Sequence, residues 1–501
     1  MTASIWPKSS SKLVAKAASG HSAIGLAVAA LIYVLCVSGA IAVFNHELQR
    51  WEQPGAPEIS AISPDAAERA AKTVLAAEAG RTSHFYIQLP TDDMPRVVLT
   101  TDTQAVFADA EGNIVGAEAH PWTQFVLDLH YYLHLPHTLG ITIVGILGVM
   151  LLGLAMSGFI AHPRIFRDAF TFRFAGNARV TQTDLHNRLS VWTAPFHVPV
   201  ALTGAWIGLA SIVGYALATL DYGGDLEAAF APVFGEEPAE DGAPAPLAGI
   251  ANALAYMAAN EPDVKPTYVI MHEPMTRGQH LQVLAEHDRR LIFGEYYNFD
   301  ANGGFVGTVG MADGTLGQQI AASTYRVHFG SFGGAPVKII YGVLGAALAF
   351  ITASGMTIYF LKRREKARPA PRLEAMWAGV VWGTPAALAL TMLASVVGLA
   401  GPSALPAGFW LALAGFIVAA ALRPDRRRVA ARLRALAAAA LALALAIHAG
   451  LHQDAFFSPA AVWTSLVGGL IALAFVAPEI RARAAGRRAR TGAATIRQPA
   501  E

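Results

Sequence analysis

Four histidines in this chain stand at the start of apolar stretches, and each stretch closes with a small hydroxyl residue followed by glycine. The four units are His21 with Ser38-Gly39, His130 with Ser157-Gly158, His186 with Thr203-Gly204, and His328 with Ser354-Gly355. The separations from histidine to hydroxyl are 17, 27, 17 and 26 residues, so the first two units and the last two are copies of one pattern. Neutral imidazole is a good axial ligand of haem iron. The repeat therefore predicts that these four histidines bind haem.

The composition is that of an integral membrane protein. Of the 501 residues, 54 % are hydrophobic and only 15 % are charged, and the mean hydropathy is +0.41, outside the usual soluble balance. A helix needs about 20 apolar residues to cross a bilayer. Stretches of this kind lie near 21–45, 138–161, 190–219, 336–361, 375–400, 407–422, 431–449 and 460–478. We predict a mainly α, polytopic membrane protein with about eight transmembrane helices.

Basic residues mark alternate ends of these stretches. They precede the first stretch (Lys8, Lys12, Lys16) and follow the second, fourth, sixth and eighth, where they include Arg164, Arg167, Arg173, Arg179, Lys362, Arg363, Arg364, Arg423, Arg426, Arg427, Arg428, Arg432, Arg481 and Arg483. The connections 400–406 and 450–459 contain no lysine or arginine. The positive-inside rule therefore makes both termini cytoplasmic. Because short loops with this role offer no folded basic surface, no nucleic-acid partner is predicted.

Two polar segments, 47–129 and 221–327, are large enough for small external domains. Both have an α+β pattern. A helix is predicted from Pro64 in the first and near 246–259 in the second. Strands are predicted at 85–89, 96–100, 105–116, 267–271, 281–285 and around 299–306. The order of span, domain and span therefore occurs twice.

The predicted boundaries follow from these patterns. They are 1–20 (cytoplasmic N-terminus), 21–45 (helix 1), 46–129 (external domain 1), 130–161 (helix 2), 162–187 (cytoplasmic loop), 188–220 (helix 3), 221–327 (external domain 2 with an acidic linker), 328–361 (helix 4), 362–374 (cytoplasmic loop), 375–478 (four more helices) and 479–501 (cytoplasmic tail). The linker, 232–246, contains Glu236, Glu237, Glu240 and Asp241 and is expected to be flexible. The first stretch is expected to remain as an uncleaved anchor.

The single cysteine limits the redox chemistry. Cys36 is the only cysteine of the chain, which excludes an intrachain disulfide and a thiolate-bound iron–sulfur cluster.

These features resemble the PepSY-associated transmembrane helix family of bacterial inner membranes, which includes reductases of ferric siderophores. The resemblance covers roughly residues 12–365 and is carried by 21–25, 129–133, 184–189 and 328–334. It implies two PepSY-like periplasmic domains and a place in the inner membrane. Asn187 departs from the arginine that the family typically has, His134 replaces a usual leucine, and the last four spans lie beyond the common core. No role is assigned to those spans.

The predicted topology divides the four histidines into two pairs. His21 and His186 enter their spans from the cytoplasmic face, and His130 and His328 from the external face. Polar side chains at membrane depth are retained mainly at functional sites, and a core about 30 Å thick has room for two b-type haems. With the resemblance, this predicts a transmembrane reductase that needs no catalytic nucleophile. Electrons would enter near the first pair, and a periplasmic ferric siderophore or other ferric chelate would be reduced near the second.

Other histidines have weaker patterns. His197 is a possible alternative ligand or lines the electron path, and His134 or His137 could replace His130 or contact the substrate. His448 and His452 are four residues apart on one helix face, a possible additional metal site. The remaining ones are assigned to the surface or interface: His46, His84, His120, His162, His272, His280 and His287.

The glycines and aromatic residues near the four histidines are each open to two interpretations. The glycines of the repeat allow close approach of either a porphyrin or a neighbouring helix. Trp122, Tyr131 and Tyr132 either cover the edge of the external haem or form an interfacial belt.

Two other functional classes fit the same sequence. A non-catalytic regulator would bind a peptide or protease through the external domains, and its purified form would be colourless. A permease would use the last four spans as a route for an iron complex, although these spans are nearly free of embedded charge. The short cytoplasmic loops contain no glycine-rich nucleotide-binding fingerprint, so the electron donor would be a quinol or a separate reductase.

Overall fold

The computed structural model describes residues 10–165, 169–170, 177–235, 241–288, 290–455 and 457–495. Several residues used in the topology prediction, and three of the four acidic residues named for the predicted linker, lie outside these ranges: Lys8, Arg167, Arg173, Glu236, Glu237 and Glu240.

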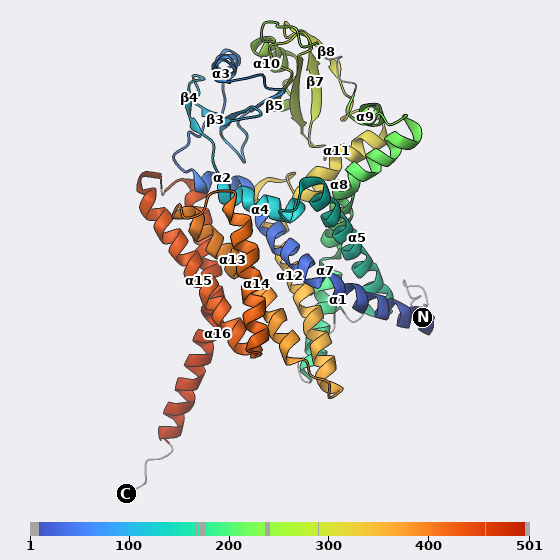
Figure 1. Cartoon of the computed structure of the whole chain (residues 1–501), viewed down its shortest axis with the longest axis vertical. Helices are drawn as coiled ribbons and strands as arrows, with labels where there is room; N and C mark the ends of the chain where they lie inside the picture. Colours follow the sequence, from blue (N-terminus) through green and yellow to red (C-terminus); the bar gives the residue numbers. More distant parts are fainter. Residues whose placement is uncertain are drawn as a thin grey trace.

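Within the described ranges, eight helices are long and apolar enough to cross a membrane. They are α1 (Ser11–Ala42), α5 (His137–Ala161), α8 (Ala194–Asp221), α12 (Gly334–Glu365), α13 (Pro371–Val396), α14 (Ala404–Leu422), α15 (Arg426–Leu451) and α16 (Pro459–Thr495). They form the lower part of the molecule in Figure 1. The prediction of a mainly α, polytopic membrane protein with eight spans is confirmed.

Three of the four predicted histidine-led spans are broken into two helices. His130, His186 and His328 lie on separate shorter helices: α4 (Pro121–Tyr132), α7 (Ala178–Trp192) and α11 (Leu316–Phe329). The spanning helices that follow them therefore begin later than the 130, 188 and 328 that we expected.

Local backbone chemistry explains these breaks. After α4, Leu133 and His134 both have positive φ angles of 56° and 55°, and Pro136 precedes α5. Gly330 ends α11 with a φ of 69°, the left-handed conformation that glycine adopts most easily. Pro195 near the start of α8 lacks the N–H that a continuous helix would need.

The two external segments build one continuous sheet. Its antiparallel strands run in the order β4-β3-β2-β1-β5-β6-β7-β8. They are β1 (His84–Gln88), β2 (Val97–Thr100), β3 (Ala105–Ala108), β4 (Ile114–Ala117), β5 (Val264–His272), β6 (His280–His287), β7 (Glu295–Phe299) and β8 (Phe305–Thr308). Each half is a four-strand meander preceded by a helix, α3 (Pro64–Ala77) or α10 (Ile250–Asn260). The halves meet where β1 pairs with β5, so the two predicted segments share one sheet.

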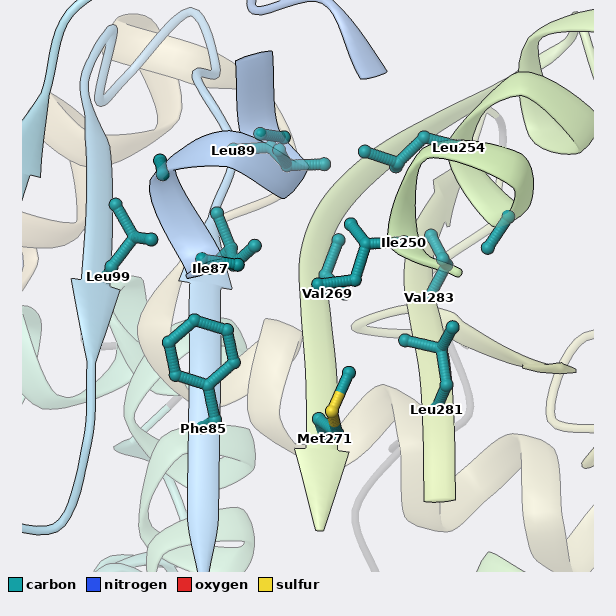
Figure 2. Close-up of a cluster of buried hydrophobic side chains, with 14 of the residues drawn as sticks. Phe85, Ile87, Leu89, Leu99, Ile250, Leu254, Val269, Met271, Leu281 and Val283 are labelled. Atoms are coloured by element: carbon teal, nitrogen blue, oxygen red, sulfur yellow. The ribbon is translucent and has the colours of Figure 1, made fainter. Parts of the chain in front are cut away.

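A single hydrophobic core joins the two halves. Side chains from one face of β1, β2, β5 and β6 pack with those of α3 and α10 (Figure 2), and Phe85, Ile87, Val269 and Met271 are fully buried. Burying a side chain of this size contributes about 1.5–3 kcal/mol. The α3 carboxylate of Glu68 also accepts a hydrogen bond from the first turn of α10. The sheet with α3 and α10 lies above the membrane helices in Figure 1.

A buried cation ties the sheet to the spanning helices. Lys338, near the start of α12, has a side chain only 5 % exposed, and its Nζ lies 2.9 Å from Glu47 Oε1 and 3.2 Å from Asp93 Oδ2. Glu47 belongs to the short helix α2 (Asn45–Glu52) and Asp93 to the connection between β1 and β2. The ion pairs therefore hold α2, a sheet loop and α12 together.

Lys338→Met is expected to destabilise the protein by about 2 kcal/mol, because it leaves Glu47 and Asp93 without their cation. The loss is smaller than for a fully buried pair, since the two carboxylates are 26 % and 36 % exposed. Thermal unfolding in detergent measures the effect. The matched control is Lys265→Met, which breaks a 3.9 Å pair with the fully exposed Asp92 and should change stability little. Equal losses in both variants would contradict a structural role for the buried pairs.

The four C-terminal spans pack around α13. Helices α14 and α15 both pack against α13, and α15 also packs against α16. Glu374 of α13 is buried and paired with Arg364 at the end of α12, while Trp51 of α2 stacks on His448 of α15. These contacts attach the last four helices to the rest of the bundle.

Candidate haem sites

Each histidine of the repeat contacts the hydroxyl-glycine pair of a different unit's helix. On the sheet side of the bundle, His130 of α4 donates from Nδ1 to the Leu35 carbonyl of α1 over 3.1 Å, with Ser38 Oγ at 3.5 Å. His328 of α11 donates from Nδ1 to the Val200 carbonyl of α8 over 3.1 Å. A carbonyl oxygen can only accept, so Nδ1 carries the proton in both rings. These two rings form the upper pair.

The lower pair, at the opposite end of the helices, repeats this geometry. His21 of α1 donates from Nδ1 to the Leu154 carbonyl of α5 over 3.0 Å, next to Ser157 Oγ at 3.2 Å. His186 of α7 donates from Nδ1 to the Ile351 carbonyl of α12 over 3.1 Å. The hydroxyl of Ser354 on α12 lies 2.8 Å from the same nitrogen.

Each hydroxyl-glycine pair thus contacts the histidine of another unit rather than the histidine of its own unit. Helix α1 carries His21 at the lower pair and Ser38-Gly39 at the upper pair, where His130 of the second unit contacts it. The third and fourth units are related in the same way, since Thr203 contacts His328 and Ser354 contacts His186. Since His21 and Ser38 are 17 residues apart on one helix, the two pairs are separated by about 25 Å.

Each pair joins one histidine from each half of the repeat. The ring centroids of His130 and His328 are 6.2 Å apart with an interplanar angle of 25°. Those of His21 and His186 are 6.4 Å apart with an angle of 84°. Two metal–imidazole bonds of about 2.0 Å, each with roughly 1.1 Å from nitrogen to ring centre, give a centroid separation of about 6.2 Å. The spacing would leave room for one metal ion between the two rings of each pair.

The donor chemistry fits haem better than a bare metal ion. Among the described residues, Nε2 of these four rings makes no hydrogen bond, which leaves its lone pair for a metal. No cluster of three or more His, Cys, Asp and Glu side chains with metal-binding geometry occurs in the described part of the chain, whereas protein zinc sites use three or four ligands. With Cys36 as the only cysteine, a haem would be held without thioether bonds, as b-type haem is.

The glycines of the repeat sit against the imidazole rings. A Cβ on Gly39 would lie 2.6 Å from Cε1 of His130, and a Cβ on Gly204 would lie 2.7 Å from Cε1 of His328. The corresponding distances at Gly158 and Gly355 are both 3.4 Å, to His21 and His186. The glycines therefore make room for the histidine rings themselves, a third role beside the two that the sequence left open.

Helix α4 is fixed by a carboxylate at its N-terminus. Glu52 of α2 accepts hydrogen bonds from the backbone N–H groups of Trp122 and Thr123, over 2.9 and 2.7 Å. The indole of Trp122 in turn donates to the Leu388 carbonyl of α13 over 3.3 Å. Since His130 lies in the last turn of α4, these contacts position one ring of the upper pair.

We expect the replacement Glu52→Gln to change the pH dependence of stability. Burial raises the pKa of Glu52, against the hydrogen bonds from Thr123 and Trp122. As pH rises above about 4.3, the unfolded chain loses this proton before the folded protein does, so wild-type stability falls until the folded pKa is passed. The variant lacks this loss. The difference in unfolding midpoint, variant minus wild type, should therefore be larger at pH 7.5 than at pH 4.5. A difference that does not change with pH would contradict the raised pKa of Glu52.

The other candidate histidines lie outside both pairs. The ring of His197 is buried, and its Nδ1 lies 3.0 Å from Thr193 Oγ1 one turn earlier. His134 contacts the Phe125 carbonyl from Nε2 over 2.9 Å and stacks on the Phe125 ring, and the exposed His137 lies beside Tyr132. No hydrogen bond or ring contact in the described chain joins these three to the paired rings.

His448 and His452 do lie close together, with ring centroids 4.6 Å apart. The ring of His448, however, stacks on Trp51 and its Nε2 donates to the Trp51 carbonyl over 2.6 Å. This nitrogen is therefore engaged in packing α15 against α2.

The three aromatic residues expected near the external haem are divided by the structure. Trp122 is buried against α13, and Tyr132 lies beside His134 and His137. The ring of Tyr131 is next to His130, at 6.2 Å, and to Phe329, at 6.1 Å.

The sheet gathers three histidines that the sequence analysis treated as separate surface residues. His84, His272 and His280 occupy directly paired positions on β1, β5 and β6, with neighbouring ring centroids 5.6 and 6.3 Å apart. They alternate with the core side chains of Figure 2 and so lie on the other face of the sheet. The β5–β6 pairing brings His272 and His280 together, and the β1–β5 pairing between the two halves adds His84. Residue spacing carries no signal for the second of these pairings.

Comparisons with known proteins match the part of the chain that carries the four histidines of the repeat. A family model described as PepSY-associated TM region matches residues 18–363, a range that contains all four paired histidines and ends before α13. Uncharacterized protein PA4219 of Pseudomonas aeruginosa is 30 % identical over 125 residues, which make up 25 % of this chain and 32 % of that protein. The alignment thus spans about a third of that relative's length.

Proposed function

The chain belongs to the PepSY-associated TM region family, and from this premise we propose that it is a haem b reductase of the bacterial inner membrane. It passes electrons across the bilayer to a periplasmic ferric chelate such as a ferric siderophore. The observation that carries the proposal is the arrangement of two imidazole pairs, each with ligand spacing, at opposite ends of the same helices.

The distribution of basic residues supports the direction of this transfer. Lys12 and Lys16 lie near the start of α1, and Lys362, Arg363 and Arg364 end α12, all at the end of the bundle that carries the lower pair. The positive-inside rule assigns this end to the cytoplasm. The sheet and the upper pair then face the periplasm.

A haem held by each pair would supply a one-electron iron couple. The chain's own residues orient the ligands. Donation from Nδ1 to the carbonyls of Leu35, Val200, Leu154 and Ile351 fixes the tautomer of each ring and makes Nε2 a better ligand.

The chemistry of the substrate completes the proposal. A quinol or a separate reductase gives up an electron on the lower side, and the ferric ion of the chelate gains one on the upper side. Fe(II) is a softer ion than Fe(III), so hard oxygen donors bind it less tightly. Reduction therefore releases iron from the chelate for uptake.

Reconstitution into sealed liposomes tests the proposed function. The liposomes contain a trapped reductant, and an impermeant ferric hydroxamate with a colorimetric Fe(II) trap is supplied outside. We expect Fe(II) to form outside with wild-type protein and to fall at least tenfold with His186→Ala, whose side chain belongs to the lower pair. His197→Ala, which changes another buried histidine, should retain the rate. Equal rates with His186→Ala and wild type would overturn the proposed electron path.

A further inference from the structure

A cavity lined by α14, α15 and the connection between them has no role in the proposed reductase. Helices α14 and α15 follow each other in sequence, and both pack mainly on α13. A cavity of about 750 Å³ remains where α14 ends and α15 begins, within the 300–1,000 Å³ typical of ligand sites. It lies outside the region matched by the family model, which ends at residue 363.

The lining of this cavity is amphipathic. One part is apolar, with side chains that include Phe416, Leu422, Val429 and Leu433. The other part, at the connection between the helices and the first two turns of α15, has three cations and one anion, namely Arg423, Arg428, Arg432 and Asp425.

The arginines are only partly neutralised. Asp425 pairs with Arg428 at 3.1 Å, and its carboxylate also accepts hydrogen bonds from the first backbone N–H groups of α15. Arg423 and Arg432 form no ion pair within the described residues. Three positive charges against one negative charge leave an excess of two positive charges beside the apolar part.

From this combination we infer that the cavity binds one anionic phospholipid. Its phosphate lies at Arg423, Arg428 and Arg432, and an acyl chain lies against the apolar walls between α14 and α15. Arginine presents several N–H donors to phosphate oxygens, and basic pockets between membrane helices on the cytoplasmic side bind anionic head groups. The connection is at the end of the bundle away from the sheet, where lipid head groups meet the helices.

A purely topogenic role does not account for the cavity. Arg426 and Arg427 lie in the first turn of α15 and provide the same positive charge to orient the helices, yet they do not line the cavity. A soluble anion does not account for the apolar walls, since it would leave them without a partner.

Matched double variants test the phosphate part of the inference. The full-length protein in neutral detergent is mixed with phosphatidylglycerol or phosphatidylcholine, and retained lipid is counted by native mass spectrometry. We expect one phosphatidylglycerol per chain and no retained phosphatidylcholine. Arg423→Ala with Arg432→Ala should weaken phosphatidylglycerol binding about tenfold, whereas Arg426→Ala with Arg427→Ala removes the same charge and should weaken it less than twofold. Equal weakening in the two double variants would overturn the site.

Filling the cavity tests the acyl-chain part. Ala419 lines the cavity and is exposed, so tryptophan fits there without disturbing a packed core. Ala419→Trp should abolish the retained lipid, and Val418→Trp, at a neighbouring exposed position outside the lining, should not. Phosphatidylglycerol binding that survives Ala419→Trp, or that millimolar inorganic phosphate displaces completely, would contradict a lipid site. Gel filtration verifies that each variant is folded.

Discussion

Replacing His130 with alanine is expected to lower the haem content of the purified protein from two to one per chain. The ring centroids of His130 and His328 are 6.2 Å apart, so loss of either imidazole would leave a haem held by the upper pair with one histidine of that pair. The lower haem keeps both His21 and His186. The pyridine haemochrome assay gives the haem content, and the reduced spectrum reports the ligation of the haem that remains.

Double variants distinguish the loss of one pair from a general loss of folded structure. His130→Ala with His328→Ala removes both ligands of one pair and should still leave one haem. His130→Ala with His21→Ala removes one ligand from each pair and should leave none. Loss of both haems in the first double variant, or retention of one in the second, would contradict the pairing.

His197→Ala is the matched control for these variants. This ring is buried in the same bundle, with Nδ1 near Thr193, but it belongs to neither pair, so two haems should remain. A colourless wild-type protein, prepared with an adequate haem supply, would remove the basis of the reductase proposal. The external domains would then be tested for peptide binding and the helices for transport.

The histidine repeat shows where sequence patterns suffice and where they do not. The hydropathy of the chain predicted the eight spans, because membrane helices have length and hydropathy requirements that a single sequence displays. The repeat singled out four histidines, which the structure places in two pairs. The repeat did not predict that Ser38 contacts His130 rather than His21. Such exchange depends on how helices pack, and residue spacing within one helix carries no information about its neighbour.

In the two segments that form the sheet, the local elements were likewise predictable from the sequence, whereas the long-range strand pairing was not. Their helices and strands follow local signals such as Pro64 and Ser63 at the start of α3. The continuous sheet depends on β1 pairing with β5, which joins residues far apart in the sequence, such as His84 and His272. The breaks after α4 and α11 were also missed, because apolar content continues through Leu133 and Phe329 while the backbone changes direction.

The glycines of the repeat are expected to differ in their tolerance of alanine, depending on the pair that they contact. At Gly39 and Gly204 a Cβ would lie 2.6 and 2.7 Å from an imidazole carbon, closer than atoms pack without moving. Overpacking of this kind costs about 1–3 kcal/mol, so Gly39→Ala and Gly204→Ala should displace the rings of the upper pair. At 1.4 kcal/mol for each factor of ten, the affinity of the upper haem should fall by roughly 5- to 150-fold.

Gly158→Ala and Gly355→Ala are the matched controls. Their added Cβ atoms would lie 3.4 Å from His21 and His186, a distance that a shift of a few tenths of an ångström relieves. All four glycines lie within helices, so alanine brings a similar gain in helix propensity of up to about 1 kcal/mol at each position. Haem titration of the four purified variants therefore isolates the steric effect. If all four weakened haem binding equally, the glycines would be needed for close approach of the porphyrin. If only Gly39→Ala and Gly204→Ala weakened haem binding, the role of the glycines would be to leave room for the histidine rings.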